Sequence, residues 1–80
     1  MSEANGIIER WPAITPEDGK SIPVTDGIRC NVDGTAVLTD NKGNSNPFYL
    51  IAGLDYPYAV VEVKATGTDA DMGLKALYFA

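Results

Sequence analysis

The sequence predicts an all-β fold, a small sandwich or barrel of about six short antiparallel strands with an extended N-terminal arm. Three observations favour it. Apolar and polar residues alternate along several short segments, and no segment keeps a helical period over about ten residues. Turn residues recur about every 8–12 positions, a spacing typical of β-sandwiches and barrels. The chain has 80 residues, enough for one domain.

Residues 1–21 form the predicted arm, and residues 22–80 form the predicted β domain. Pro12 and Pro16 interrupt any helix and push the residues before them into extended backbone. Residues 7–11 are a short apolar island within a polar stretch. The island either packs on its own sheet or contacts another subunit. If it contacts another subunit, deleting residues 1–12 should weaken assembly more than folding.

The first strands follow the arm. Residues 22–24 read as a short edge strand because they contain a proline. Residues 28–32 alternate apolar and polar, which predicts a buried face that Cys30 shares with the apolar residues on either side. Asp33-Gly34 then predicts a two-residue hairpin turn into a strand at 35–39.

Three more strands complete the predicted sheet. After a polar turn at 40–44, residues 48–51 read as a third strand. The longest strand is predicted at 58–66, with a core face made of Ala59, Val61, Val63 and Ala65. Residues 74–79 are apolar on both faces, so we expect this strand to be covered twice and its end to be held in place.

The charge argues against nucleic-acid and membrane partners. Eleven acidic residues against six basic ones give a net charge of −5, and the basic residues are scattered. No basic stripe is present for a phosphate backbone. No apolar run approaches the ~20 residues of a membrane-spanning helix. The first residues lack the basic and apolar regions of a signal peptide, so we expect a protein made and kept in the cytoplasm.

The residue types needed for catalysis or cofactor binding are largely missing. The chain has no histidine and one cysteine, so Cys–His catalysis, a zinc cluster and an internal disulfide are excluded. We therefore expect no enzymatic activity and no cofactor. The sequence around Asp69 and Asp71 begins like a calcium loop but lacks its remaining ligands, so it reads as a solvated turn. The sequence leaves open whether calcium binds there.

Assembly with other chains is the expected source of stability. A domain of this size is marginal without disulfides, a metal or a partner, and 45% of the residues are hydrophobic. We predict that some apolar and aromatic side chains are buried between subunits or against a larger partner. These are Ile7, Ile8, Trp11, Tyr56, Tyr58, Tyr78 and Phe79. Tyrosines 56 and 58 also fit an alternative, a small module that binds carbohydrate or a host protein.

A family resemblance rests on motifs spread over most of the chain. These are Ala-Ile-Thr-Pro-Glu-Asp at 13–18, Ile22-Pro23, Gly27-Ile28, Gly53 before Tyr56-Pro57, Val-Lys-Ala-Thr-Gly-Thr-Asp-Ala at 63–70, and Ala-Leu-Tyr at 76–78. Their order resembles a group of small phage and gene-transfer-agent proteins that form the base of spikes at capsid vertices.

The resemblance implies a structural virion protein, assembled in the host cytoplasm, that acts as a vertex spike-base or head-decoration (cement) subunit. Its implied partners are itself, as a homo-oligomer such as a ring, and the major capsid protein or a spike fibre protein. A tail or tail-tip component of the same kind of particle is the remaining alternative.

Overall fold

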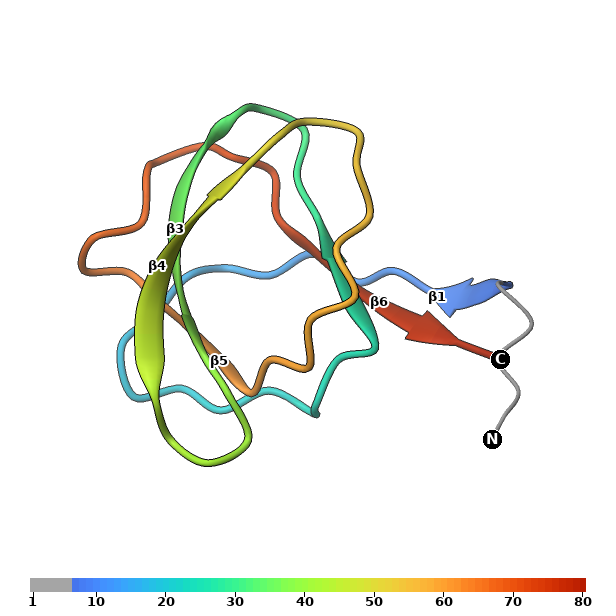
Figure 1. The fold of residues 1–80 in the computed structure, drawn as a ribbon, viewed down its shortest axis with the longest axis horizontal. Coiled ribbons are helices and arrows are strands. Elements are labelled where there is room, and N and C mark those ends of the chain that lie inside the picture. The colour runs from blue at the N-terminus through green and yellow to red at the C-terminus, as the bar shows by residue number, and fades with distance from the viewer. Residues whose placement is uncertain (1–6) are drawn as a thin grey trace.

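The computed structural model describes residues 7–80 as two three-stranded antiparallel sheets, without a helix in that range (Figure 1). One sheet has the order β1-β6-β2 and the other β4-β3-β5. The strands are β1 (Ile8–Arg10), β2 (Gly27–Arg29), β3 (Gly34–Thr39), β4 (Ser45–Leu50), β5 (Glu62–Lys64) and β6 (Lys75–Phe79). The predicted all-β class is confirmed. No helix in residues 7–80 has the length and apolar character needed to cross a membrane.

Strand β6 is the centre of the first sheet. Strand β2 pairs with its first half, where Gly27 lies opposite Leu77. Strand β1 pairs with its second half, where Ile8 lies opposite Phe79, and the Ala80 amide donates to the Ile7 carbonyl. Figure 1 shows β1 and the end of β6 projecting from the body of the protein. The predicted anchoring of the C-terminal strand is confirmed.

The arm continues along β6 after β1. The Ala76 amide donates to the Pro12 carbonyl, and the Ile14 amide donates to the Leu74 carbonyl. Residues of both faces of β6 are buried, with Leu77 1% and Tyr78 8% exposed. The expected double covering of this strand is therefore confirmed. The predicted division between arm and domain at residue 21 stays a prediction.

Strand β3 is the centre of the second sheet. It pairs with β4, where Val37 lies opposite Pro47, and with β5, where Leu38 lies opposite Val63. The Val37 amide points away from β4 and donates to the Thr68 hydroxyl. Val37 and Pro47 are therefore a non-hydrogen-bonded pair. Because Pro47 lies on an edge strand, its missing amide removes no hydrogen bond between β3 and β4.

The core lies between the two sheets and draws on both. Its buried members are Ile28, Cys30, Ala36, Leu38, Leu50, Val60, Val63, Met72 and Leu74. The prediction that Cys30 is buried is confirmed, and burial raises the pKa of its thiol. A thiol in that state behaves as a small apolar side chain.

The predicted hairpin at Asp33-Gly34 is wrong. Strands β2 and β3 belong to different sheets, so the chain passes from one sheet to the other there, through the exposed residues 31–33. The Asp33 carboxylate instead accepts a hydrogen bond from the Ala52 amide at 2.7 Å. Val32, expected on the buried face, is 53% exposed because β2 already ends at Arg29.

The predicted strands at 22–24 and 58–66 also need correction. No strand forms at 22–24, although the Ile22 amide donates to the Val61 carbonyl. Strand β5 is confined to Glu62–Lys64 because the chain bends at Val61. The bend shifts the alternation of buried and exposed side chains along the chain. Val60 is buried in consequence, whereas Ala59 and Ala65 of the predicted core face are exposed. The third predicted strand, at 48–51, begins earlier, at Ser45.

Candidate interaction surface

A depression with both apolar and polar lining residues lies on the outer face of the β1-β6-β2 sheet, and we call it the ribbon face. It has a volume of about 370 Å³ and is lined by Ile8, Trp11, Arg29, Asn31, Lys75 and Leu77. Alternation along β6 turns residues 75, 77 and 79 to this side. Ile7 and Trp11 are 59% and 58% exposed at its β1 border. Exposed large apolar side chains beside a depression are typical of protein-binding surfaces.

Two basic side chains, those of Arg29 and Lys75, line the ribbon face. Arg29 and Asp55 form a two-point ion pair, with 3.0 Å between Nη2 and Oδ2, and this partner raises the pKa of the guanidinium. The Arg10 guanidinium lies 4.5 Å above the centre of the Tyr78 ring. Both interactions fix the orientation of an arginine without burying its charge. Arg29 and Lys75 therefore line the ribbon face, whereas Arg10 lies over Tyr78 on the other side of β6.

The seven predicted contact residues are divided between separate places. Ile7, Ile8 and Trp11 border or line the ribbon face, and Phe79 pairs with Ile8 there. Tyr78 is turned to the other side of β6, buried, with its hydroxyl donating to the Pro23 carbonyl at 2.7 Å. The contact role of these residues stays a prediction.

Tyrosines 56 and 58 lie apart from the ribbon face. Their rings stack with centroids 5.5 Å apart, and Tyr58 also packs on Phe48 at 5.2 Å. The Tyr56 hydroxyl accepts a hydrogen bond from the Ile51 amide. Tyr58 and Phe48 line a groove of about 250 Å³ beside β4. Both tyrosines are half-buried, so much of their ring surface already serves the fold.

A second groove, which we call the loop groove, lies between residues 13–16 of the arm and residues 65–75. It has a volume of about 430 Å³, and Asp69 and Asp71 are among its lining residues. The Asp69 carboxylate accepts a hydrogen bond from the Thr35 amide. Within residues 7–80, no group of three or more His, Cys, Asp or Glu side chains is placed to hold a metal ion.

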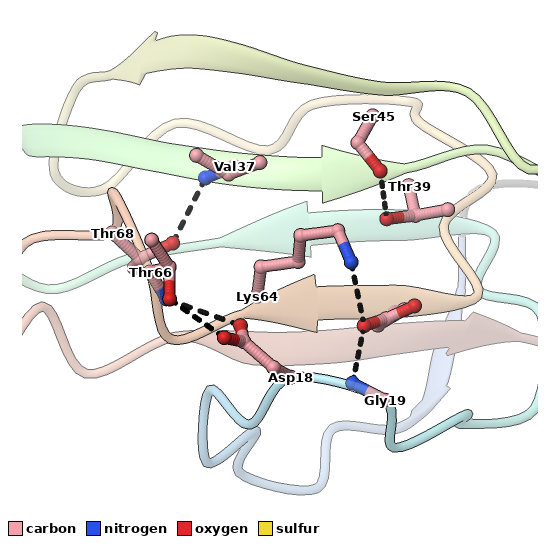
Figure 2. Close-up of polar contacts among 9 residues, drawn as sticks. Asp18, Gly19, Val37, Thr39, Ser45, Lys64, Thr66 and Thr68 are labelled. Carbon is pink, nitrogen blue, oxygen red and sulfur yellow. Dashed lines mark hydrogen bonds and ion pairs between the residues drawn. The ribbon is translucent and has the colours of Figure 1, made fainter.

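Among the polar contacts in Figure 2, those of Asp18 and Gly19 fasten the arm to the body of the protein. The Asp18 carboxylate accepts hydrogen bonds from both the amide and the hydroxyl of Thr66, and these bonds lower the pKa of Asp18. The Glu62 carboxylate accepts from the Gly19 amide, which lowers the pKa of Glu62. The motif at 13–18 and the motif at 63–70 therefore meet in space, and the contacts that join them are structural.

Sequence reasoning missed part of the ribbon face and, apart from Asp69 and Asp71, the residues of the loop groove. The alternation in the last strand places Leu77 beside Phe79, which is a usable signal for one lining residue. Arg29 lies opposite Lys75 only because β2 pairs with β6. That pairing joins segments more than forty residues apart, and nothing local in the sequence indicates it.

Comparison with known proteins places the chain in a structural class. No protein-family model and no curated protein sequence matches it. Its fold is similar to that of a chain in a solved structure described as "Capsid of native GTA particle computed with C5 symmetry", where GTA stands for gene transfer agent. The TM-score is 0.79 with 30% identity, covering 88% of this chain and 82% of that chain. This chain therefore belongs to the family of phage-like, capsid-related proteins that this gene-transfer-agent component represents.

Proposed function

We propose that the protein is an oligomeric subunit at the vertices of a phage-like capsid, a spike-base or decoration protein that docks through its ribbon face. The observation that carries the proposal is the 30% identity and shared fold with a component of a gene-transfer-agent capsid. The capsid relative also supports a structural, non-enzymatic role. The proposed partners are further copies of this chain and the major capsid protein or a spike fibre protein, without nucleic acid or membrane.

The ribbon face supplies the physical means of docking. Trp11 and Ile7 expose more than half of their surface on a projecting part of the sheet. Covering such side chains removes apolar area from water, and tryptophan is among the residues that most often dominate an interface. On a particle, each subunit makes the same contact many times, so even weak contacts hold through avidity.

The binding-module alternative draws less support. It assigns the ligand to tyrosines 56 and 58, but their rings stack on each other and one hydroxyl already accepts a backbone hydrogen bond. If that alternative holds, changing both tyrosines to alanine abolishes ligand binding and leaves the oligomeric state unchanged. Loss of folding or assembly in the double variant contradicts it.

The test is to locate the protein on an intact particle. A tagged full-length chain is produced together with the particles, which are then purified and imaged by electron cryomicroscopy. We expect density for the subunit at the capsid vertices and loss of the bound protein in the Trp11→Glu variant. Val24→Glu is the matched control, because Val24 is 48% exposed and does not line the ribbon face.

Two results would contradict the proposal. One is a wild-type chain that stays entirely in the unbound fraction. The other is density on the tail, which would support the tail-component alternative instead. Equal retention of Trp11→Glu and wild type would leave the capsid role intact and exclude the ribbon face as the docking surface.

A further inference from the structure

The chain contains three Asp-Gly pairs, at 18–19, 26–27 and 33–34, and this dipeptide is chemically labile. A glycine has no side chain to hinder its own backbone nitrogen, which can attack the side-chain carboxyl carbon of the preceding aspartate. In all three pairs this carboxylate accepts a hydrogen bond from a distant backbone amide, which belongs to Thr66, Phe79 or Ala52. The fold therefore engages each reacting carboxyl group in a contact with another part of the chain.

The pair at 18–19, which we call the exposed pair, differs from the other two in its surroundings. Gly27 and Gly34 are buried and belong to strands β2 and β3, whereas Gly19 is exposed and lies in no strand. A Cβ atom at position 19 would meet no atom within 4 Å, so the backbone there has room to change its conformation. Local opening of the arm is therefore enough to free the exposed pair, whereas the other two require the opening of a strand.

Contacts with β5 and with the turn after it restrain both reacting groups of the exposed pair (Figure 2). The Asp18 carboxylate accepts from the Thr66 amide at 3.1 Å and from the Thr66 hydroxyl at 2.6 Å. The Gly19 amide donates to the Glu62 carboxylate at 2.7 Å. The hydrogen bonds from Thr66 also lower the pKa of Asp18 and keep it ionised, which is the form whose oxygen leaves least readily. The attacking nitrogen and the attacked carboxyl group are thus both held by the body of the protein.

We propose that Asp18-Gly19 is a site of spontaneous isoaspartate formation, and that its contacts with Thr66 and Glu62 control the rate. When these contacts open, the Gly19 nitrogen forms a bond to the γ-carbon of Asp18 and a carbon–oxygen bond of the carboxyl group breaks. The amide proton and the carboxyl OH leave as water, and the product is a five-membered succinimide ring. Water then adds to one of the two ring carbonyls. Addition at the former main-chain carbonyl leaves the chain running through the former side chain, which is isoaspartate.

Isoaspartate at position 18 loosens the arm. The main chain gains one methylene group, and the free carboxylate is displaced from the place where it accepts both bonds from Thr66. We expect the neighbouring bond, from the Glu17 amide to the Val63 carbonyl, to weaken with it. The inference concerns how the arm is fastened, so it stands or falls independently of the partner proposed for the ribbon face.

The three pairs can be followed separately in one sample of the full-length chain. Trypsin places each pair in its own peptide, because it cleaves after Arg10, Lys20, Arg29 and Lys42. Liquid chromatography with electron-transfer fragmentation distinguishes isoaspartate from aspartate in these peptides. In native buffer we expect the exposed pair to convert fastest of the three. In concentrated urea the three should convert at similar rates, and the exposed pair should convert at least about 10-fold faster than in native buffer.

Variants test whether the contacts control the rate. Thr66→Val removes one hydrogen bond to Asp18 and should speed conversion of the exposed pair about 5-fold in native buffer, the factor expected for one lost hydrogen bond. Glu62→Ala frees the Gly19 amide and should act in the same direction. Thr66→Ser keeps the hydroxyl and should convert like wild type. Thr15→Val is the matched control, because Thr15 is an exposed threonine on the same arm.

The pairs at 26–27 and 33–34 report whether a variant is still folded, so their rates should not change. Hydrogen exchange of the converted fraction should be faster at the Glu17 amide than in unconverted protein. The inference is overturned if the exposed pair converts in native buffer at its rate in urea, or if Thr66→Val and Glu62→Ala leave its rate unchanged. It is equally overturned if both variants speed all three pairs alike, because general unfolding and not the local contact then sets the rate.

Discussion

The side chain of Thr25 offers a sharp test of how the segment that follows the arm is held to residues 58–60. Thr25 is 2% exposed, and its hydroxyl donates to the Tyr58 carbonyl at 2.7 Å and accepts from the Val60 amide at 3.0 Å. One buried hydroxyl thus satisfies two backbone groups at the point where the sequence predicts an uninterrupted strand. Thr25→Val keeps the shape of the side chain and removes both hydrogen bonds.

The size of the effect follows from the two groups left unpaired. A buried donor or acceptor without a partner costs about 1–3 kcal/mol, and the added methyl group returns about 0.8 kcal/mol. We therefore expect Thr25→Val to lower the free energy of unfolding by about 2–3 kcal/mol, which corresponds to roughly 10–20 °C in Tm for a domain of this size. Thr25→Ser keeps the hydroxyl and loses one methyl group, so it should cost about 1 kcal/mol.

Which of the two variants has the lower free energy of unfolding is the decisive result. Burial of apolar area and β propensity both favour valine over serine, so they predict the opposite ranking. Urea and thermal unfolding followed by circular dichroism measure both variants against wild type. If Thr25→Val is as stable as wild type, or more stable than Thr25→Ser, the hydroxyl does not hold these segments together.

Three further predictions concern the carboxylate of Asp18, the turn at Gly67 and the free edge of β4. Because hydrogen bonds lower the pKa of Asp18 in the folded state, the stability that it contributes is present above pH 3.8 and is lost as the pH falls further. The difference in unfolding midpoint between wild type and Asp18→Asn should thus shrink in acid, and a constant difference would count against this. Gly67 and Gly43 both have φ of +88°, but a Cβ at 67 would lie 2.9 Å from Val37 Cγ2 whereas 43 faces open space. Gly67→Ala should destabilise the protein by about 1–2 kcal/mol more than Gly43→Ala in denaturant unfolding; equal losses would refute the steric reading. Pro47→Val restores an amide on the free edge of β4, and light scattering should show increased aggregation without loss of stability; no change in solubility would exclude a protective role.

The parts of the fold that sequence predicted are those fixed by local patterns. Cys30 is buried as expected because it follows Ile28 at strand spacing, and both point into the core. The last strand is covered twice because residues on both of its faces are apolar. Burial of this kind needs no knowledge of which strand lies alongside.

Pairing between distant segments caused the errors. Asp33-Gly34 has the composition of a hairpin turn, but each residue serves a contact with another part of the chain. The Asp33 carboxylate accepts a hydrogen bond from the Ala52 amide. A Cβ atom at position 34 would lie 2.8 Å from a carboxylate oxygen of Asp69. The glycine thus allows Asp69 to approach the backbone closely, and it does not serve a left-handed turn. The bend at Val61 also comes from a contact between distant segments, because the Thr25 hydroxyl accepts a hydrogen bond from the amide of the preceding residue, Val60.

The resemblance and the contact surface rest on different residues, and this difference determines how each is best tested. The motifs at 13–18 and 63–70 meet through Asp18 and Thr66, so they identify a shared fold. Trp11 precedes the first motif, so the partner of the ribbon face does not follow from the motifs. Deleting residues 1–12 would also remove the Pro12 carbonyl that pairs with β6, so folding and docking would fail together. Point changes at Trp11 leave that backbone pairing in place, and for that reason they test the docking role where the deletion does not.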